Sequence, residues 1–108
     1  MRSVLEEVVT YLAAELDVPV SAQAPAERPD SFVLVDPVGG ISSTDERHPE
    51  YAVQSWAVTY AAAEELSRAV CDAMLANRSM SGFTEPVPLG CDGSHTWFQS
   101  VFTMDALW

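Results

Sequence analysis

The sequence contains no lysine and few basic residues of any kind. Sixteen acidic residues face five cationic ones, so the formal net charge is −11, and the cations are Arg2, Arg28, Arg47, Arg68 and Arg78. Proteins that bind nucleic acid have clustered basic residues that contact the phosphates. The five arginines of this chain are instead spread along its whole length. An anionic membrane surface repels such a chain as well. The charge balance therefore argues against nucleic-acid and membrane-surface binding.

Cysteines and long apolar runs are also scarce. Cys71 and Cys91 show no paired C-x-x-C spacing, so we expect free thiols, no metal site and no cofactor. No apolar run approaches the roughly 20 residues that cross a bilayer. Glu6 and Glu7 stand where a signal peptide is uncharged, so we expect a protein that is cytoplasmic when made.

Groupings typical of catalysis are missing too. The histidines are His48, in a polar stretch, and His95, and neither lies in a nucleophile-base motif. The spacing of Cys91 and His95 superficially offers a thiol and an imidazole, but no further ligand accompanies them. Gly39-Gly40 lacks the lysine and hydroxyl residue of a phosphate-binding loop. We expect a protein that is not an enzyme.

The 108 residues, of which 48% are hydrophobic, suit one domain spanning residues 1–108. Ser3 and Glu6 form a capping-box pattern, and apolar residues at three-to-four-residue spacing predict a helix that continues to Leu16. Asp17 and Pro19 end it. A second helix is predicted over residues 61–77, where alanines allow close approach to a sheet.

The rest of the chain alternates between strand and loop patterns. Strands are predicted at residues 18–21 (an edge strand), 31–38 (covered on both faces or in contact with a neighbour), 51–60, near 83–87 and 95–105. Pro37 and Gly39-Gly40 end the strand at residues 31–38, and the polar residues 39–50 are interpreted as a long, mobile loop. The sum predicts an α+β fold, an antiparallel or mixed β-sheet with two α-helices packed on one face.

These segments together resemble the tail terminators of long-tailed bacteriophages, also called minor tail or head-to-tail joining proteins. The resemblance covers nearly the whole chain. It rests on LDVPVSAQAP, on RPDSFVLVDPVGG, on YAVQSWAVTYAAAEELSRAVCDAM as a strand running directly into a helix, and on WFQSVFTMD as a final strand. The polar loop is more acidic than in many relatives, and the chain ends soon after the final strand.

The resemblance implies a virion protein that assembles in the host cytoplasm as a homo-oligomer, a hexameric ring. Such a ring caps the tail tube, ends its polymerisation and provides the surface for joining to the head-tail connector or stopper protein. DNA passes through it without specific binding. Two other interpretations stay open: a neck head-completion (stopper) protein, and an acidic protein that mimics DNA or inhibits a basic enzyme.

A terminator needs one face that fits the tube and another that no tube subunit can use. The candidate docking loop consists of Gly39, Gly40, Ile41, Ser42, Ser43, Thr44, Asp45, Glu46, Arg47 and His48. A merely solvated loop is the alternative. The candidate subunit interface consists of Trp97, Leu107 and Trp108, while Trp56 and Phe98 are expected in the core. Whether the acidic residues face the bore of the ring or serve solubility stays open.

Overall fold

The structure, a computed structural model, describes residues 4–42, 46–76 and 80–107; for residues 41, 42, 46, 47, 81, 106 and 107 it describes the backbone alone. The elements follow in the order α1 (Val4–Glu15), β1 (Val20–Ser21), β2 (Ser31–Ser42), β3 (Glu46–Ala57), α2 (Tyr60–Leu75), β4 (Met80–Phe83), β5 (Val87–Asp92), β6 (His95–Met104) and β7 (Ala106–Leu107).

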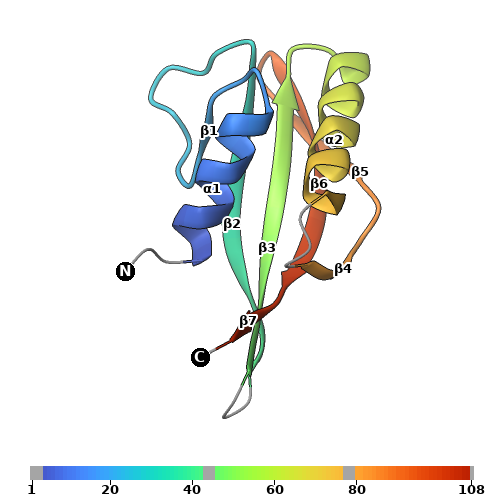
Figure 1. The fold of residues 1–108 in the computed structure, drawn as a ribbon. Coiled ribbons are helices and arrows are strands. Elements are labelled where there is room, and N and C mark those ends of the chain that lie inside the picture. The colour runs from blue at the N-terminus through green and yellow to red at the C-terminus, as the bar shows by residue number, and fades with distance from the viewer. Residues whose placement is uncertain (1–3, 43–45, 77–79, 108) are drawn as a thin grey trace.

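The strands form one mixed sheet. Its main order is β1-β2-β3-β6-β4, with β5 also paired to β6 and β7 to β3. β1 and β2 are parallel, and the other pairings are antiparallel. Figure 1 shows α1 and α2 side by side on one face of this sheet. The predicted α+β class, with two helices on one face, is confirmed.

The main core lies between the helices and the sheet. Val8 and Leu12 of α1 and Val70 and Met74 of α2 are buried there. The sheet contributes Val33, Val35, Tyr51, Val53, Phe102 and Met104 to the same cluster. A second cluster joins Ala57, Ala63 and Phe98, so the small residues of β3 and α2 do allow close contact between helix and sheet.

The helix ends agree with the sequence to within a few residues. Thr59 caps α2, because its side-chain oxygen accepts a hydrogen bond from the Ala62 amide at 3.1 Å. The predicted capping residue Ser3 and the predicted helix end at position 77 lie outside the described residues. The expected edge strand is present as β1. In place of one short strand near residues 83–87 the chain forms two, β4 and β5, and Cys91 lies in β5.

The prediction of a long loop over residues 39–50 is wrong. β2 and β3 continue as a hairpin, in which Gly39 pairs with Glu50 and Gly40 with Pro49. The pairs Ile41–His48 and Ser42–Arg47 follow, and residues 43–45 lie outside the described part. The register shifts between Pro37 and Gly39, and both glycines have a positive φ, of 122° and 132°. Glycine tolerates this backbone, so the pair creates a bulge after which the strand continues.

Candidate assembly surfaces

The outer part of the β2–β3 hairpin, together with β7, forms a feature that we call the arm: residues 39–42, residues 46–50 and Ala106–Leu107. β7 pairs with β3 through Glu46–Leu107 and Arg47–Ala106. Figure 1 shows the arm continuing past the ends of both helices, and the molecule is elongated, with extents of 44 × 26 × 22 Å. The predicted docking residues that the structure describes and Leu107 of the predicted interface therefore lie in one feature.

A polar contact ties the base of the arm to the end of β6. Nδ1 of His48 lies 3.0 Å from Oδ1 of Asp105, with both side chains partly exposed. Thr103 Oγ1 also donates to Glu50 Oε2 at 3.3 Å. His48 was expected to lie in a loop, but it lies in a paired strand. Ser43, Thr44, Asp45 and Trp108, which belong to the predicted sites, lie outside the described residues.

The sheet face away from the helices carries an aromatic cluster. Trp56 stacks on Phe32, with ring centroids 5.3 Å apart, and on Trp97, with centroids 4.1 Å apart. His95 meets the edge of the Phe32 ring at 5.6 Å. Because side chains alternate along a strand, Phe32 and Val33 lie on opposite faces of β2, and both are buried. The expectation that this strand is covered on both faces is confirmed.

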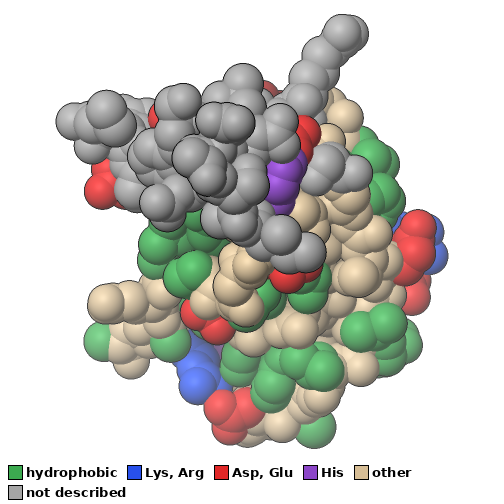
Figure 2. All heavy atoms as spheres, turned by 90° about the horizontal axis from the view of Figure 1, so that it is seen from below, with side chains coloured by type: hydrophobic (Ala, Val, Ile, Leu, Met, Phe, Trp, Pro, Cys, Tyr) green, Lys and Arg blue, Asp and Glu red, His purple; other side chains and the backbone are tan. Residues whose placement is uncertain are grey.

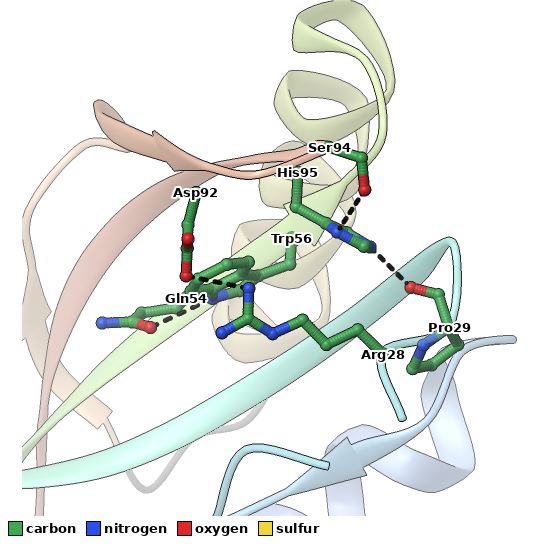
Figure 3. Close-up of polar contacts among 7 residues, drawn as sticks. All are labelled: Arg28, Pro29, Gln54, Trp56, Asp92, Ser94 and His95. Carbon is green, nitrogen blue, oxygen red and sulfur yellow. Dashed lines mark hydrogen bonds and ion pairs between the residues drawn. The ribbon is translucent and has the colours of Figure 1, made fainter. Parts of the chain in front are cut away.

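The guanidinium of Arg28 lies over the Trp56 ring of the aromatic cluster (Figure 3). Its guanidinium carbon lies 5.0 Å from the centroid of Trp56, and its Nη1 lies 2.8 Å from Oδ2 of Asp92. The indole nitrogen of Trp56 donates to Gln54 Oε1 at 3.0 Å, and Gln54 Nε2 donates to Gln99 Oε1 at 3.2 Å. Sequence reasoning missed Arg28, Gln54 and Gln99, because no local pattern indicates which strands bring them together.

His95 has a structural role in this layer. Its Nε2 lies 2.8 Å from the carbonyl oxygen of Pro29, and its Nδ1 lies 3.3 Å from the hydroxyl of Ser94. A carbonyl only accepts, so Nε2 carries the proton in this contact. In the β5–β6 register Cys91 pairs with Thr96 and Asp92 with His95, so Cys91 and His95 point to opposite faces of the sheet. The Cys91 thiol and the His95 imidazole therefore do not form a common site.

Of the predicted interface residues, Trp97 is described with its side chain, and Leu107 by its backbone alone. Trp97 is half-buried against Trp56, and Gly90 leaves room for it, since a Cβ there would lie 3.3 Å from the indole. Among the described side chains, Trp97 Nε1 is a buried nitrogen without a hydrogen-bond partner. Trp56 and Phe98 are buried, as expected. Contact between subunits through Trp97 or Leu107 stays a prediction.

The two thiols differ in environment. Cys71 is buried with Sγ 3.6 Å from the Ser100 hydroxyl, and burial is the main cause that raises the pKa of the Cys71 thiol. Cys91 is exposed, and both thiols are free. Within the part of the chain that the structure describes, no group of three His, Cys, Asp or Glu side chains is placed to hold a metal ion.

The acidic surface is dispersed. On the face in Figure 2 the carboxylates form separate patches among hydrophobic and uncharged groups, and the visible cations lie next to carboxylates. Among the described ion pairs, Arg28 contacts Asp92 and Arg68 contacts Glu64. No described helix is long and apolar enough to cross a membrane.

β2 leaves most of one edge unpaired over the described residues, and β5 leaves the whole of one edge unpaired. β2 pairs with β1 only at Val33 and Leu34, and β5 pairs with β6 alone. Each carries a proline and a register shift, at Pro37 and at Pro88. A proline has no amide to donate and a bulge twists the edge, so both features oppose the addition of a further strand. Contacts between copies are expected to use side chains.

No protein-family model matches this chain, and no curated protein sequence matches it. Solved structures do match. One is a chain in the virion of a native gene transfer agent particle, with a TM-score of 0.62 at 14% sequence identity. The alignment covers 94% of this chain and 84% of that chain. The shared property is an α+β fold over nearly the whole length, and this chain has that fold.

Proposed function

We propose that this chain is a structural protein of a phage-like virion, which assembles as a hexameric ring, caps the tail tube and ends its polymerisation. The opposite face of the ring joins the head connector or stopper protein. The observation that carries the proposal is the fold shared with a chain of a gene transfer agent virion, over 94% of the present chain. The resemblance of the sequence to phage tail terminators points the same way.

The arm supplies the contact with the tube end or the connector. A capping subunit must reach a neighbour and present a surface unlike that of the tube subunits. The arm extends past both helices, and the predicted docking residues that the structure describes lie on paired strands. Contact with a partner therefore costs less ordering than contact by a loose loop. The subunit interface uses side chains including Trp97 and Leu107.

Charge sets the conditions for assembly. Each copy has a formal net charge of −11, so neighbouring copies repel one another, and salt that shortens the Debye length to about 8 Å weakens the repulsion. Acidic groups that face the bore would also keep passing DNA from binding. The protein acts by shape and attachment and not by catalysis, within the virion and, before that, in the host cytoplasm.

The test is assembly of purified protein. Size-exclusion chromatography with light scattering and electron microscopy should show rings that become more abundant with salt. Mixed with polymerising tail tube protein of the same particle, the chain should halt tube growth. A variant in which Asn-Gly replaces residues 41–48 should keep the fold but fail to cap. The control Glu7→Gln, at an exposed position of α1, should cap normally. Unaltered tube lengths with the native chain would contradict the proposal.

A further inference from the structure

A groove of about 320 Å³ lies between the end of α1 and the first half of α2. Its floor is apolar and includes Leu16, Val18 and Leu66, which pack partly buried against the main core. Its rim carries the carboxylates of Glu15, Asp17 and Glu65. The groove is separate from the arm and is lined by neither the aromatic cluster nor the predicted docking residues.

The charges on this rim contradict the usual preference of a helix end. Glu15 is the last residue of α1 and Asp17 follows closely, while the last turn of α1 contains no basic residue. A helix C-terminus has a partial negative charge and favours cations, so carboxylates there lower stability. Residues that break a local rule without a compensating contact in the same chain are typical of functional positions.

No cation of the chain compensates them within the described side chains. Arg28 pairs with Asp92 near the far face of the sheet, and Arg68 lies beside Glu64 in the next turn of α2. Glu15, Asp17 and Glu65 therefore surround the apolar floor without a described cationic partner. The helix end and the carboxylates together make the groove electrostatically suited to a positive charge.

We propose that this groove binds an arginine or lysine side chain from a basic segment of another protein. The aliphatic stem of such a side chain lies along Leu16, Val18 and Leu66, and its charged end reaches the carboxylates. This proposal goes beyond capping and holds whether or not the chain forms a ring. On this proposal α1 and α2 also contact a partner protein, in addition to the contact made by the arm.

The chemistry of the groove favours this occupant over two others. A metal ion needs several converging oxygen ligands, and no such group exists among the described residues. A second copy of this chain has no lysine and the same net charge of −11, so it is a poor source of the cation. A basic partner is attracted both by the rim and by the charge of the whole chain.

The experiment titrates the full-length protein with the amidated peptide LRALRA and with its acidic counterpart LEALEA, using isotope-edited NMR and calorimetry. LRALRA should shift the amide signals of groove residues, and LEALEA should not. The triple variant Glu15→Gln, Asp17→Asn, Glu65→Gln should bind LRALRA at least about tenfold more weakly. The control Glu7→Gln, Glu27→Gln, Asp36→Asn removes the same charge at exposed sites elsewhere and should retain most of the affinity.

A substitution that supplies the cation within the chain gives a second readout. Ala69 lines the groove four residues after Glu65, so Ala69→Arg places a guanidinium beside the rim in the favourable i,i+4 order. This variant should lose LRALRA binding and unfold at a higher temperature, whereas Ala24→Arg, at an exposed site between β1 and β2, should do neither. Equal weakening in both triple variants, shifts spread over the whole surface, or no binding by the native protein would overturn the proposal.

Discussion

Trp56 and Trp97 stand directly opposite each other in the β3–β6 pairing, and their rings stack with centroids 4.1 Å apart and planes 12° apart. They lie on the sheet face that no helix covers. Phe32, Arg28 and His95 complete a layer there that buries Trp56 to 6% exposure. The sheet is therefore stabilised from both faces, by a helical layer on one side and by this aromatic cluster on the other.

We expect Trp56→Ala to lower the free energy of unfolding by about 3–5 kcal/mol, the usual cost of truncating a buried large aromatic. Trp97→Ala should cost less, because Trp97 is only half-buried. Trp97→Phe retains a stacking ring and serves as the control. Urea unfolding followed by far-UV circular dichroism measures all three, since the signal does not depend on indole fluorescence. A smaller loss for Trp56→Ala than for Trp97→Ala would contradict this assignment.

The ion pair between Arg28 and Asp92 should contribute little as a charge pair. Both side chains are substantially exposed, at 36% and 55%, so a double-mutant cycle should give a coupling below about 1 kcal/mol. Arg28→Ala should nevertheless destabilise more than Asp92→Ala, because Arg28 also covers the Trp56 ring. Arg28→Met, which retains an aliphatic cover, should recover part of the difference. Equal losses for the two alanine variants would show that the cover is unimportant.

The two glycines of the arm should respond differently to alanine. Both have a positive φ that strains any other residue, at a cost of roughly 1–3 kcal/mol. A Cβ at Gly40 would also overlap the carbonyl oxygen of His48, whereas a Cβ at Gly39 meets open space. Gly40→Ala should therefore lower the urea midpoint more than Gly39→Ala. Amide NMR shifts around His48 would show whether the pairing of the arm is disturbed.

Stability should fall at alkaline pH. Burial raises the pKa of Cys71 above its ordinary value of 9.0 and that of Tyr51 above 10.0. The folded state thus favours the protonated forms, so this stabilisation is complete below the unfolded pKa values and is lost as pH rises through the folded ones. The urea midpoint should decline above about pH 9.

Two variants measure the separate contributions of Tyr51 and Cys71 to this alkaline loss of stability. Tyr51→Phe and Cys71→Ala should each reduce the alkaline loss of stability, since each removes a buried group that must ionise. Cys91→Ser removes an exposed thiol and should leave the pH profile unchanged. A native profile that is flat between pH 8 and pH 11 would contradict the assignment.

The sequence by itself determined the α+β fold class and most of the elements. The apolar periodicity of α1 and α2, the alternation in β6 and the small residues of β3 are local signals, and the structure follows them. The net charge of −11 and the lack of lysine argue against nucleic-acid and membrane-surface binding, and this argument needs no knowledge of the fold. The resemblance to tail terminators also came from local segments and their order.

Tertiary structure alone decided the arm and the aromatic cluster. Gly39-Gly40 looks locally like the end of a strand, but pairing with Glu50 and Pro49 turns it into a bulge within a continuing hairpin. Arg28 and Asp92 meet across 64 residues of sequence, and the groove needs two helices at a particular separation. Such features depend on strand register and helix placement, which are set by the packing of the whole chain and leave no periodic signal in any one segment.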